Sequence, residues 1–206
     1  MVALASSYDP KHADLDSFSG QQRALFLDRD GVINVNCGYV HLTDNFEFID
    51  GIFDVARTAH AFGFKLVVIT NQSGIGRGYF SERDFHQLTA WMCNQFLNEG
   101  APIQKVYFSP FHPTAGLGEY KKNDISRKPR PGMINQAQRD INLDLGSSIL
   151  IGDEVSDIQA GITAGVGLNI LFSQKSLPKA SGLSYQKIET LHEARFFMNG
   201  SCKKLG

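Results

Sequence analysis

Two aspartates separated by one residue follow a short apolar segment near the start of the chain. Asp28 and Asp30 come directly after the run Ala24–Leu27, and Gly31 allows a sharp turn behind them. Two carboxylates this close repel each other unless a cation lies between them. Taken alone, the pattern favours a turn with solvated acids. It is not a calcium loop, because the twelfth position, which needs Glu, is Tyr39.

A second polar cluster follows the β-branched run Lys65–Thr70. It offers a hydroxyl, two amides and backbone N–H groups in a glycine-rich turn, Thr70-Asn71-Gln72-Ser73-Gly74. Such a turn can hold an anion. It is not a Walker A loop, because no Gly-Lys-Ser/Thr follows. A flexible glycine loop explains the cluster equally well.

Two further charged segments occur later in the chain. Arg127-Lys128-Pro129-Arg130 is a compact run of three cations that proline stiffens, with a nuclear-type basic run as the alternative. Asp153 and Glu154 follow the apolar run 148–151 and precede a helical pattern, so a helix cap explains them when they are taken alone.

Continuous apolar runs alternate with helical patterns along the body of the chain. Such runs are typical of strands buried on both faces, and they occupy 24–27, 65–70, 105–108, 148–151 and 168–172. Spacings of three and four residues predict helices at 52–62, from Ser81 to Phe96 with Asp84 in a capping box, from Pro131, and at 157–164. This alternation predicts an α/β fold with a doubly wound, mostly parallel sheet. Ligands of such sheets bind beyond the carboxyl ends of the strands.

Together and in this order, the four polar segments match the motifs of the haloacid dehalogenase (HAD) superfamily of phosphotransferases. Within it, the chain resembles the D-glycero-D-manno-heptose 1,7-bisphosphate phosphatases from Ala24 to about Phe172. The stretches that match most densely are FLDRDGVIN, GYVHLTDNFEFIDG, VVITNQSGIGRG and RKPRPGM.

The resemblance implies a mechanism. Asp28 matches the nucleophile that forms an aspartyl-phosphate, and Asp30 matches the general acid and base. Mg²⁺ would bind Asp28, the backbone carbonyl of Asp30 and Asp153, since hard oxygen ligands suit this ion. Lys128 matches the lysine that stabilises charge on the transferring phosphoryl group. Asp157 is expected to orient the metal site.

The resemblance also implies substrate contacts. Thr70, expected to be catalytic as well, and the Asn71 N–H group match the phosphate-binding motif. Arg127 matches a position that contributes to substrate recognition, beside Lys128. The remaining substrate-contacting loops of the family correspond to Asn36, Cys37, Gly38, Tyr39, Gln72 and Ser73.

The spacing of the elements argues against a cap domain. Only about twenty residues separate the first strand from the helix near Gly51, too few for a folded domain, and the loop from Pro110 to Lys128 is equally short. We therefore expect one capless HAD-like domain over 23–200. An extension over 1–22 would pack loosely or not at all, and a tail would occupy 201–206.

One loop departs from the pattern of the bacterial relatives. They usually carry a zinc-binding Cys-x-His or Cys-x-x-His pair followed by Cys-x-Cys. This chain has Ser109 and His112, then Asp124 and Ser126. Structural zinc sites need thiolates or imidazoles, so we expect no zinc here. A second departure is Glu154, because relatives often have Lys there, and this charge reversal leaves the substrate preference open.

Composition limits the class of protein. The 206 residues include 20 Lys and Arg against 21 Asp and Glu, a net charge of −1, which argues against a nucleic-acid or membrane surface. The three cysteines are too few and too scattered for a disulfide framework. No segment approaches the roughly 20 apolar residues of a membrane helix. We expect a cytoplasmic protein, with a monomer favoured and a dimer left open.

The leading interpretation is a Mg²⁺-dependent phosphomonoesterase. It would remove the C7 phosphate of heptose 1,7-bisphosphate in nucleotide-heptose biosynthesis, for lipopolysaccharide, capsule or S-layer glycan. One alternative is a phosphatase for histidinol phosphate or another small sugar phosphate. A non-catalytic binding protein on the same fold is the alternative from another class, because fold does not imply function.

Overall fold

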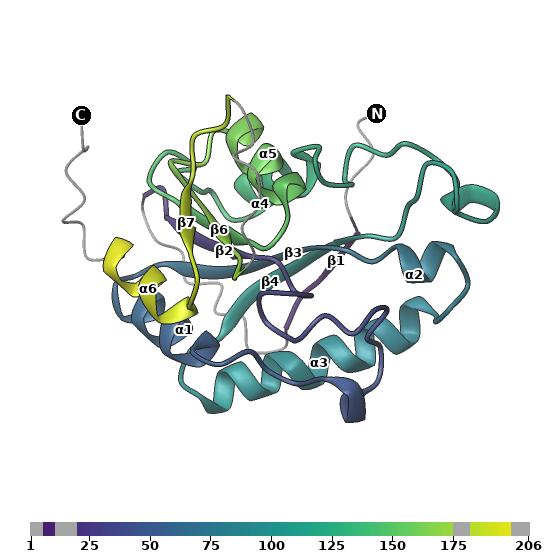
Figure 1. The fold of residues 1–206 in the computed structure, drawn as a ribbon, viewed down its shortest axis with the longest axis horizontal. Helices are drawn as coiled ribbons and strands as arrows, with labels where there is room; N and C mark the ends of the chain where they lie inside the picture. Colours follow the sequence, from purple (N-terminus) through teal and green to yellow (C-terminus); the bar gives the residue numbers. More distant parts are fainter. Residues whose placement is uncertain (1–5, 11–19, 175–181, 199–206) are drawn as a thin grey trace.

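The structure, a computed structural model, describes residues 6–10, 20–174 and 182–198. Seven strands of this part of the chain form one sheet in the order β1-β4-β3-β2-β5-β6-β7 (Figure 1). Every neighbouring pair is parallel except β1 and β4. The strands are β1 Ser6–Tyr8, β2 Ala24–Leu27, β3 Lys65–Asn71, β4 Ile103–Ser109, β5 Ile149–Gly152, β6 Leu168–Phe172 and β7 Gln186–Ile188.

Helices cover both faces of the sheet. Helices α1 (Ile52–Ala61), α3 (Glu82–Asn98) and α6 (Leu191–Ala194) lie on one face, and α4 (Gly132–Asp140) and α5 (Val155–Ala164) lie on the other (Figure 1). The side chains of β2 alternate between the two cores, which explains its continuous apolar sequence. The doubly wound α/β fold is confirmed. The short helices are α2 Ser73–Gly76, η1 Thr43–Asn45, η2 Gly118–Tyr120 and η3 Arg195–Phe197.

Local sequence signals set the helix starts. The Ser81 hydroxyl accepts a hydrogen bond from the Asp84 N–H group at 3.2 Å, and the Ser81 N–H group donates to the Asp84 carboxylate at 2.8 Å. This is the capping box that the sequence predicts. Pro131 was expected within the first turn of α4, and it directly precedes the first helical residue.

The start of the chain differs from expectation. Ser6–Tyr8 pairs with β4, with Ser6 opposite Phe108 and Tyr8 opposite Val106. The prediction of a loosely packed extension over 1–22 is therefore wrong for these residues. A three-residue edge strand has no apolar period to reveal it. Strand β7 and helix α6 were not predicted either. Residues 11–19 and the expected tail at 201–206 lie outside the described part.

Two connections frame the carboxyl-end edge of the sheet. Each carries a single 3₁₀ helix, η1 between β2 and α1 and η2 between β4 and α4. Neither is large enough to form a cap domain, so loops cover this edge, as predicted. In the described part of the chain, no helix combines the length and apolar character needed to cross a membrane.

Candidate active site

The four polar segments meet beyond the carboxyl ends of β2, β3 and β5. They line a cavity of about 380 Å³. The lining residues are Asp28, Asp30, Asn36, Gly38, Tyr39, Thr70, Asn71, Gln72, Ser73, Gly74, Lys128, Asp153, Glu154, Ser156 and Asp157. The structure thus brings together residues from parts of the chain that are far apart in sequence.

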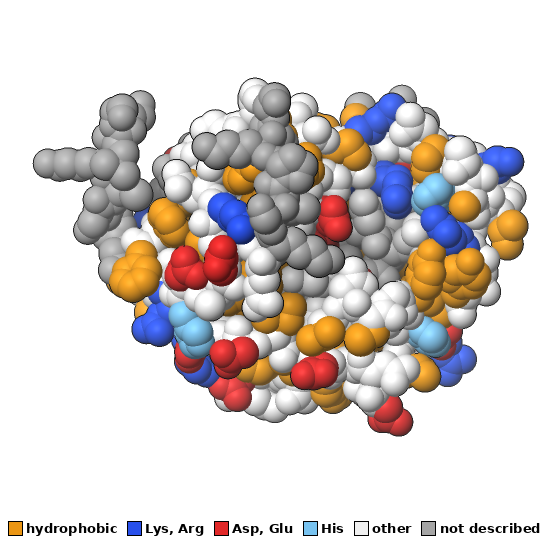
Figure 2. Space-filling view, in the orientation of Figure 1, with side chains coloured by type: hydrophobic (Ala, Val, Ile, Leu, Met, Phe, Trp, Pro, Cys, Tyr) orange, Lys and Arg blue, Asp and Glu red, His pale blue; other side chains and the backbone are white. Residues whose placement is uncertain are grey.

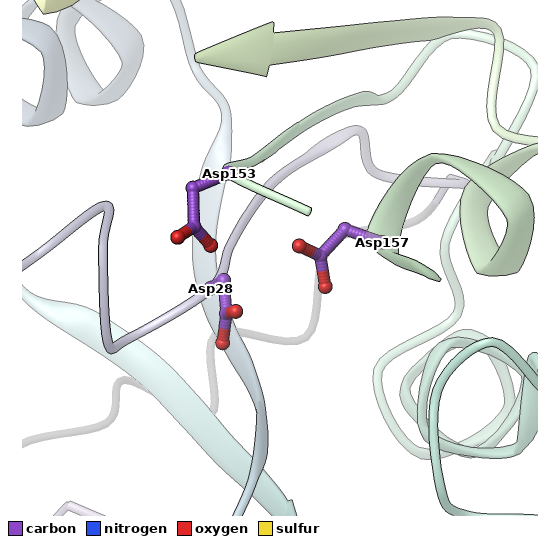
Figure 3. Close-up of side chains that lie close together, drawn as sticks. All are labelled: Asp28, Asp153 and Asp157. Carbon is purple, nitrogen blue, oxygen red and sulfur yellow. The ribbon is translucent and has the colours of Figure 1, made fainter. Parts of the chain in front are cut away.

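Three carboxylates form a tight cluster in this cavity. Asp28, Asp153 and Asp157 each offer an oxygen within 4.8 Å of the others, and the side chains of Asp153 and Asp157 point toward Asp28 (Figure 3). Asp28 and Asp153 are two of the predicted metal ligands, and Asp157, expected to orient the metal site, lies beside them. The carboxylate of Asp30 is bound by Arg29. Only the backbone carbonyl of Asp30 was expected to bind metal, and its side chain serves another purpose.

The electrostatics of the cluster fit a cation. Burial, with the charge of Asp157, raises the pKa of Asp28 to about 7, although Lys128 opposes this shift. Burial and the charges of Asp28 and Asp157 raise the pKa of Asp153 to about 8. Asp153 Oδ1 is buried and has no hydrogen-bond partner among the described residues. A divalent cation would satisfy this oxygen and favour both ionised carboxylates, so the site fits Mg²⁺.

Lys128 crosses the base of the cavity. Its ammonium lies 2.8 Å from Asp28 Oδ1 and 2.6 Å from Asp157 Oδ1, and it donates to the Ile69 carbonyl at 2.9 Å. Burial alone would lower the pKa of Lys128. The negative charges of Asp157 and Asp28 raise it by more, so the pKa lies above its ordinary value. The side chain is therefore a fixed positive charge beside the carboxylate of Asp28.

Two residues at the end of β3 have side chains that are already engaged. The Asn71 side chain bonds the backbone of Lys128, donating to its carbonyl at 3.2 Å and accepting from its N–H group at 3.1 Å. The Gln72 amide donates to Asp30 Oδ2 at 2.8 Å and to Thr70 Oγ1 at 3.0 Å. A substrate that accepts a hydrogen bond from the Gln72 amide N–H groups would therefore have to replace Asp30 or Thr70 as the acceptor.

Two predicted substrate-binding residues do not line this cavity. Cys37 is exposed and lines a neighbouring pocket of about 680 Å³, and Tyr39 borders both cavities. Arg127 is half-buried and donates to the Phe111 carbonyl at 3.0 Å. Burial, then the charge of Arg77, lowers its pKa. Arg77 lies 5.7 Å from the centre of the Tyr39 ring.

Positive charge therefore gathers beside the cavity. Burial, followed by the charges of Arg127 and Arg77, lowers the pKa of His112. In Figure 2, blue and pale-blue side chains lie among hydrophobic ones at the right of the molecule, over α2 and the loop after β4. We call Arg77 and Arg127 the cationic cluster, which lies near the neutral imidazole of His112. Its position next to Tyr39 suits a second anionic group on a ligand whose first end enters the cavity.

Hydrogen bonds link the two ends of the loop that leads to Lys128. The buried Ser126 hydroxyl lies 3.0 Å from Ser109 Oγ and 2.7 Å from Asp124 Oδ1. Asp124 Oδ2 also pairs with Lys122 at 3.2 Å. His112 is engaged separately, because its Nδ1 accepts from the backbone of Ala115 at 2.9 Å.

Sequence reasoning missed several residues of the site. Arg29 and Asn34 both bond the Asp30 carboxylate, at 2.8 Å and 3.1 Å. Arg29 stands between the two aspartates, so its position was a usable signal, whereas nothing local marks Asn34. Gly74 and Ser156 also line the cavity.

Comparison with known proteins agrees with this geometry. Residues 125–170 match the family model described as HAD-hydrolase-like. The chain is 50% identical over 180 residues to D-glycero-alpha-D-manno-heptose-1,7-bisphosphate 7-phosphatase of Burkholderia mallei, covering 87% of this chain and 95% of the relative. It is 46% identical over 148 residues to D-glycero-beta-D-manno-heptose-1,7-bisphosphate 7-phosphatase of Yersinia pestis, covering 72% and 79%.

A solved structure shares the fold. D,D-heptose 1,7-bisphosphate phosphatase from B. bronchiseptica, complexed with magnesium and phosphate, superposes with a TM-score of 0.72 and 24% sequence identity. The match covers 85% of this chain and 97% of that structure.

Proposed function

The chain belongs to the family of HAD phosphatases that act on heptose 1,7-bisphosphate, and we propose that it removes the C7 phosphate of D-glycero-D-manno-heptose 1,7-bisphosphate. The observation that carries this proposal is the meeting of Asp28, Asp30, Lys128 and Asp153 in one cavity, with a cationic cluster beside it. The protein is a phosphoric monoester hydrolase, and we place its action in cytoplasmic nucleotide-heptose synthesis.

The reaction proceeds in two steps. A carboxylate oxygen of Asp28 attacks phosphorus, and the bond from phosphorus to the sugar oxygen breaks as Asp30 gives that oxygen a proton. Asp30 then takes a proton from water, which attacks the aspartyl-phosphate. The bond to Asp28 breaks, inorganic phosphate leaves, and both carboxyl groups return to their starting states.

Fixed charges support both steps. Lys128, held between Asp28 and Asp157, stabilises negative charge on the phosphoryl group, and Thr70 with the Asn71 N–H group orients its oxygens. Asp28, Asp153 and the Asp30 carbonyl would hold Mg²⁺, with Asp157 close by. The ion supplies positive charge that offsets repulsion between phosphate and carboxylate.

The cationic cluster favours a bisphosphate over histidinol phosphate. A second phosphate is attracted to Arg77 and Arg127, whereas the ammonium group of histidinol phosphate is repelled by them. The relatives from Burkholderia mallei and Yersinia pestis are named for the alpha and the beta anomer of the substrate, respectively. Glu154 lines the cavity, where its negative charge would affect which anomer binds. The anomer is therefore the property to measure.

Phosphate release from four substrates tests the proposal. The α and β anomers of heptose 1,7-bisphosphate, heptose 7-phosphate and histidinol phosphate are compared with and without Mg²⁺. We expect Mg²⁺-dependent turnover with the highest kcat/KM for one anomer of the bisphosphate. Preference for histidinol phosphate would contradict the proposal. Absence of turnover for all four would favour a binding protein.

We also propose that this enzyme needs no structural zinc. Support comes from the loop before Lys128, where hydrogen bonds among Ser109, Asp124 and Ser126 join the two ends of the loop. Ser and Asp oxygens with one engaged imidazole make a poor zinc set. Metal analysis of the purified protein tests this, because one zinc ion per chain would contradict it.

The domain assignment remains a proposal as well. A single phosphatase domain over 23–200, completed at its edge by β1, is consistent with the continuous sheet. A small phosphorylated sugar is the partner that this site accommodates. We propose a monomer with no nucleic-acid or membrane partner.

A further inference from the structure

Arg29 is the largest fully buried side chain of the described residues, and it stands between the two aspartates of the site. It is 1% exposed. Its Nε and Nη1 atoms are buried without a hydrogen-bond partner among the described residues. Burying a guanidinium with two nitrogens unbonded costs free energy that the bonds of its third nitrogen must offset, so stability alone is a weak reason for an arginine here. Its presence calls for another explanation.

All hydrogen bonds of the Arg29 side chain come from Nη2. This atom lies 2.8 Å from each oxygen of Asp30 and donates to the Val40 carbonyl at 2.7 Å. Val40 follows the loop of Asn36 to Tyr39, three members of which line the cavity. One nitrogen therefore joins the acid–base carboxylate to the loop that borders the substrate.

Two further side chains bind the same carboxylate. Asn34 Nδ2 donates to Asp30 Oδ1 at 3.1 Å, and Gln72 Nε2 donates to Oδ2 at 2.8 Å. Gln72 also donates to Thr70 Oγ1, and both Gln72 and Asn34 are buried. Three donors from three directions fix the plane of the carboxylate, while Asp30 still lines the cavity.

We propose that Arg29 and Gln72 are positioning residues that aim the Asp30 carboxyl group at the oxygen leaving the sugar. This inference rests on the proposed function. The proton moves from Asp30 to that oxygen as the bond between oxygen and phosphorus breaks, so a misdirected carboxyl leaves the departing alkoxide without its proton. Arg29 also donates a hydrogen bond to the Val40 carbonyl. The Asp30 carboxyl group and the loop 36–39, which precedes Val40, therefore keep a fixed separation.

Leaving groups of different basicity separate this role from a structural one. An aryl phosphate releases a weakly basic phenolate that needs little protonation, whereas a sugar or simple alkyl phosphate releases an alkoxide that needs it. The test measures KM and, by rapid quench, the rate of the first phosphoryl transfer to Asp28 from p-nitrophenyl phosphate, ethyl phosphate and the heptose bisphosphate. The first transfer is used because Asp30 also activates water in the second step, whatever the leaving group. The variants are Arg29→Met, Arg29→Lys, Gln72→Leu and Asp30→Asn.

We expect Arg29→Met and Gln72→Leu to slow the first phosphoryl transfer from the alkyl and sugar phosphates by about 10–100-fold, with KM unchanged. The same step with the aryl phosphate should stay within about threefold, and Asp30→Asn should show this contrast more strongly. Arg29→Lys should keep more of the activity on alkyl and sugar phosphates than Arg29→Met, because every side-chain bond of Arg29 comes from the single atom Nη2 and one ammonium can donate to the same acceptors. Arg57→Met, which removes a surface arginine paired with Asp54 and Glu99, is the control and should change neither rate.

Equal losses in the first phosphoryl transfer from alkyl and aryl phosphates would make Arg29 and Gln72 purely structural and overturn the proposal. Unchanged rates on both would overturn it as well. If Arg29→Met does not fold, Gln72→Leu still tests the proposal. It removes a donor to Asp30 without removing a buried charge. Failure of the proposed function looks different. The wild-type enzyme would then hydrolyse the aryl and ethyl phosphates but not the heptose bisphosphate.

Discussion

Gly31 lies so close to Asp153 that no side chain fits between them. A Cβ atom at Gly31 would lie 2.0 Å from Asp153 Oδ2, and the backbone of Gly31 has a φ of +92°. The loop that carries the first aspartate pair thus packs directly against the carboxylate that follows β5. Glycine is the residue that permits both the backbone conformation and the approach.

We expect Gly31→Ala to displace Asp153 and to weaken Mg²⁺ binding and turnover together, by at least about tenfold. Gly63→Ala is the matched control, because Gly63 has a φ of +78° and nothing within 4 Å of its added Cβ. Both variants lose about 1–2 kcal/mol of stability from the strained backbone. Calorimetric Mg²⁺ titration separates them, and equal affinities would contradict the steric argument.

Asp28→Asn should abolish phosphate release, since the amide cannot form the aspartyl-phosphate. The expected loss in kcat is at least about 10⁴-fold, and KM is measured only if activity persists. Asp50→Asn is the control, because the Asp50 side chain is 99% exposed. Wild-type turnover by Asp28→Asn would show that another group attacks phosphorus.

Without metal, the stability of the protein should fall as pH rises. The folded-state pKa of Asp28 is about 7 and that of Asp153 about 8, both above the ordinary 3.8. The folded protein therefore binds more protons than the unfolded one, and this stabilisation is complete below pH about 4 and lost through about 8. Thermal melts in a chelator test the slope. Mg²⁺ should stabilise most at high pH, because its ligands must be deprotonated.

Asp153→Asn should flatten that slope. The variant loses a buried charge that Asp28 and Asp157 repel, so without metal its Tm at pH about 8 should exceed that of the wild type. Each kcal/mol gained in the free energy of unfolding corresponds to about 2–4 °C in Tm. It should also lose Mg²⁺ binding. A lower Tm would mean that the carboxylate stabilises the fold even without a cation.

Ser126→Ala should loosen the loop before Lys128. The change leaves the buried Ser109 hydroxyl without this partner and removes one bond from Asp124, at a cost of about 1–3 kcal/mol. Ser147→Ala is the control, because it removes a comparable bond to Asp144 at an exposed site. Denaturant unfolding compares the two, and similar costs would contradict the role of the buried network.

Arg77→Gln should impair the bisphosphate selectively. If the cationic cluster binds the second phosphate, KM for heptose bisphosphate rises about tenfold or more, while heptose 7-phosphate is unaffected. Arg83→Gln, at an exposed position on α3, provides the control. Equal effects on both substrates would place Arg77 at the transferred phosphate instead.

The sequence revealed the fold through its buried strands. A strand such as β2, covered on both faces, must be apolar throughout, and a parallel sheet places the polar residues that follow each strand at one edge. Asp28 and Asp153 could therefore be assigned to one site from their positions after apolar runs, before any contact was known.

Contacts between distant segments could not be read in this way. Gln72 stands in a glycine-rich turn that suggests anion binding, yet its amide donates to Asp30, in the loop after β2. The closeness of Asp157 to the carboxylate cluster depends on how α5 packs, and sequence spacing does not fix that. Strand β1 was missed because its partner β4 lies far along the chain and its own residues carry little apolar pattern.

The bonds of Lys128 also bear on how the chain folds. Its ammonium contacts Asp28, which follows β2, and Asp157 on α5. It also donates to Ile69 in β3, which is 59 residues from Lys128 in the sequence. Loop-closure entropy delays such non-local contacts during refolding. Recovery of catalytic activity should therefore lag behind recovery of helical signal, and the enzyme would report its own last folding events through its turnover.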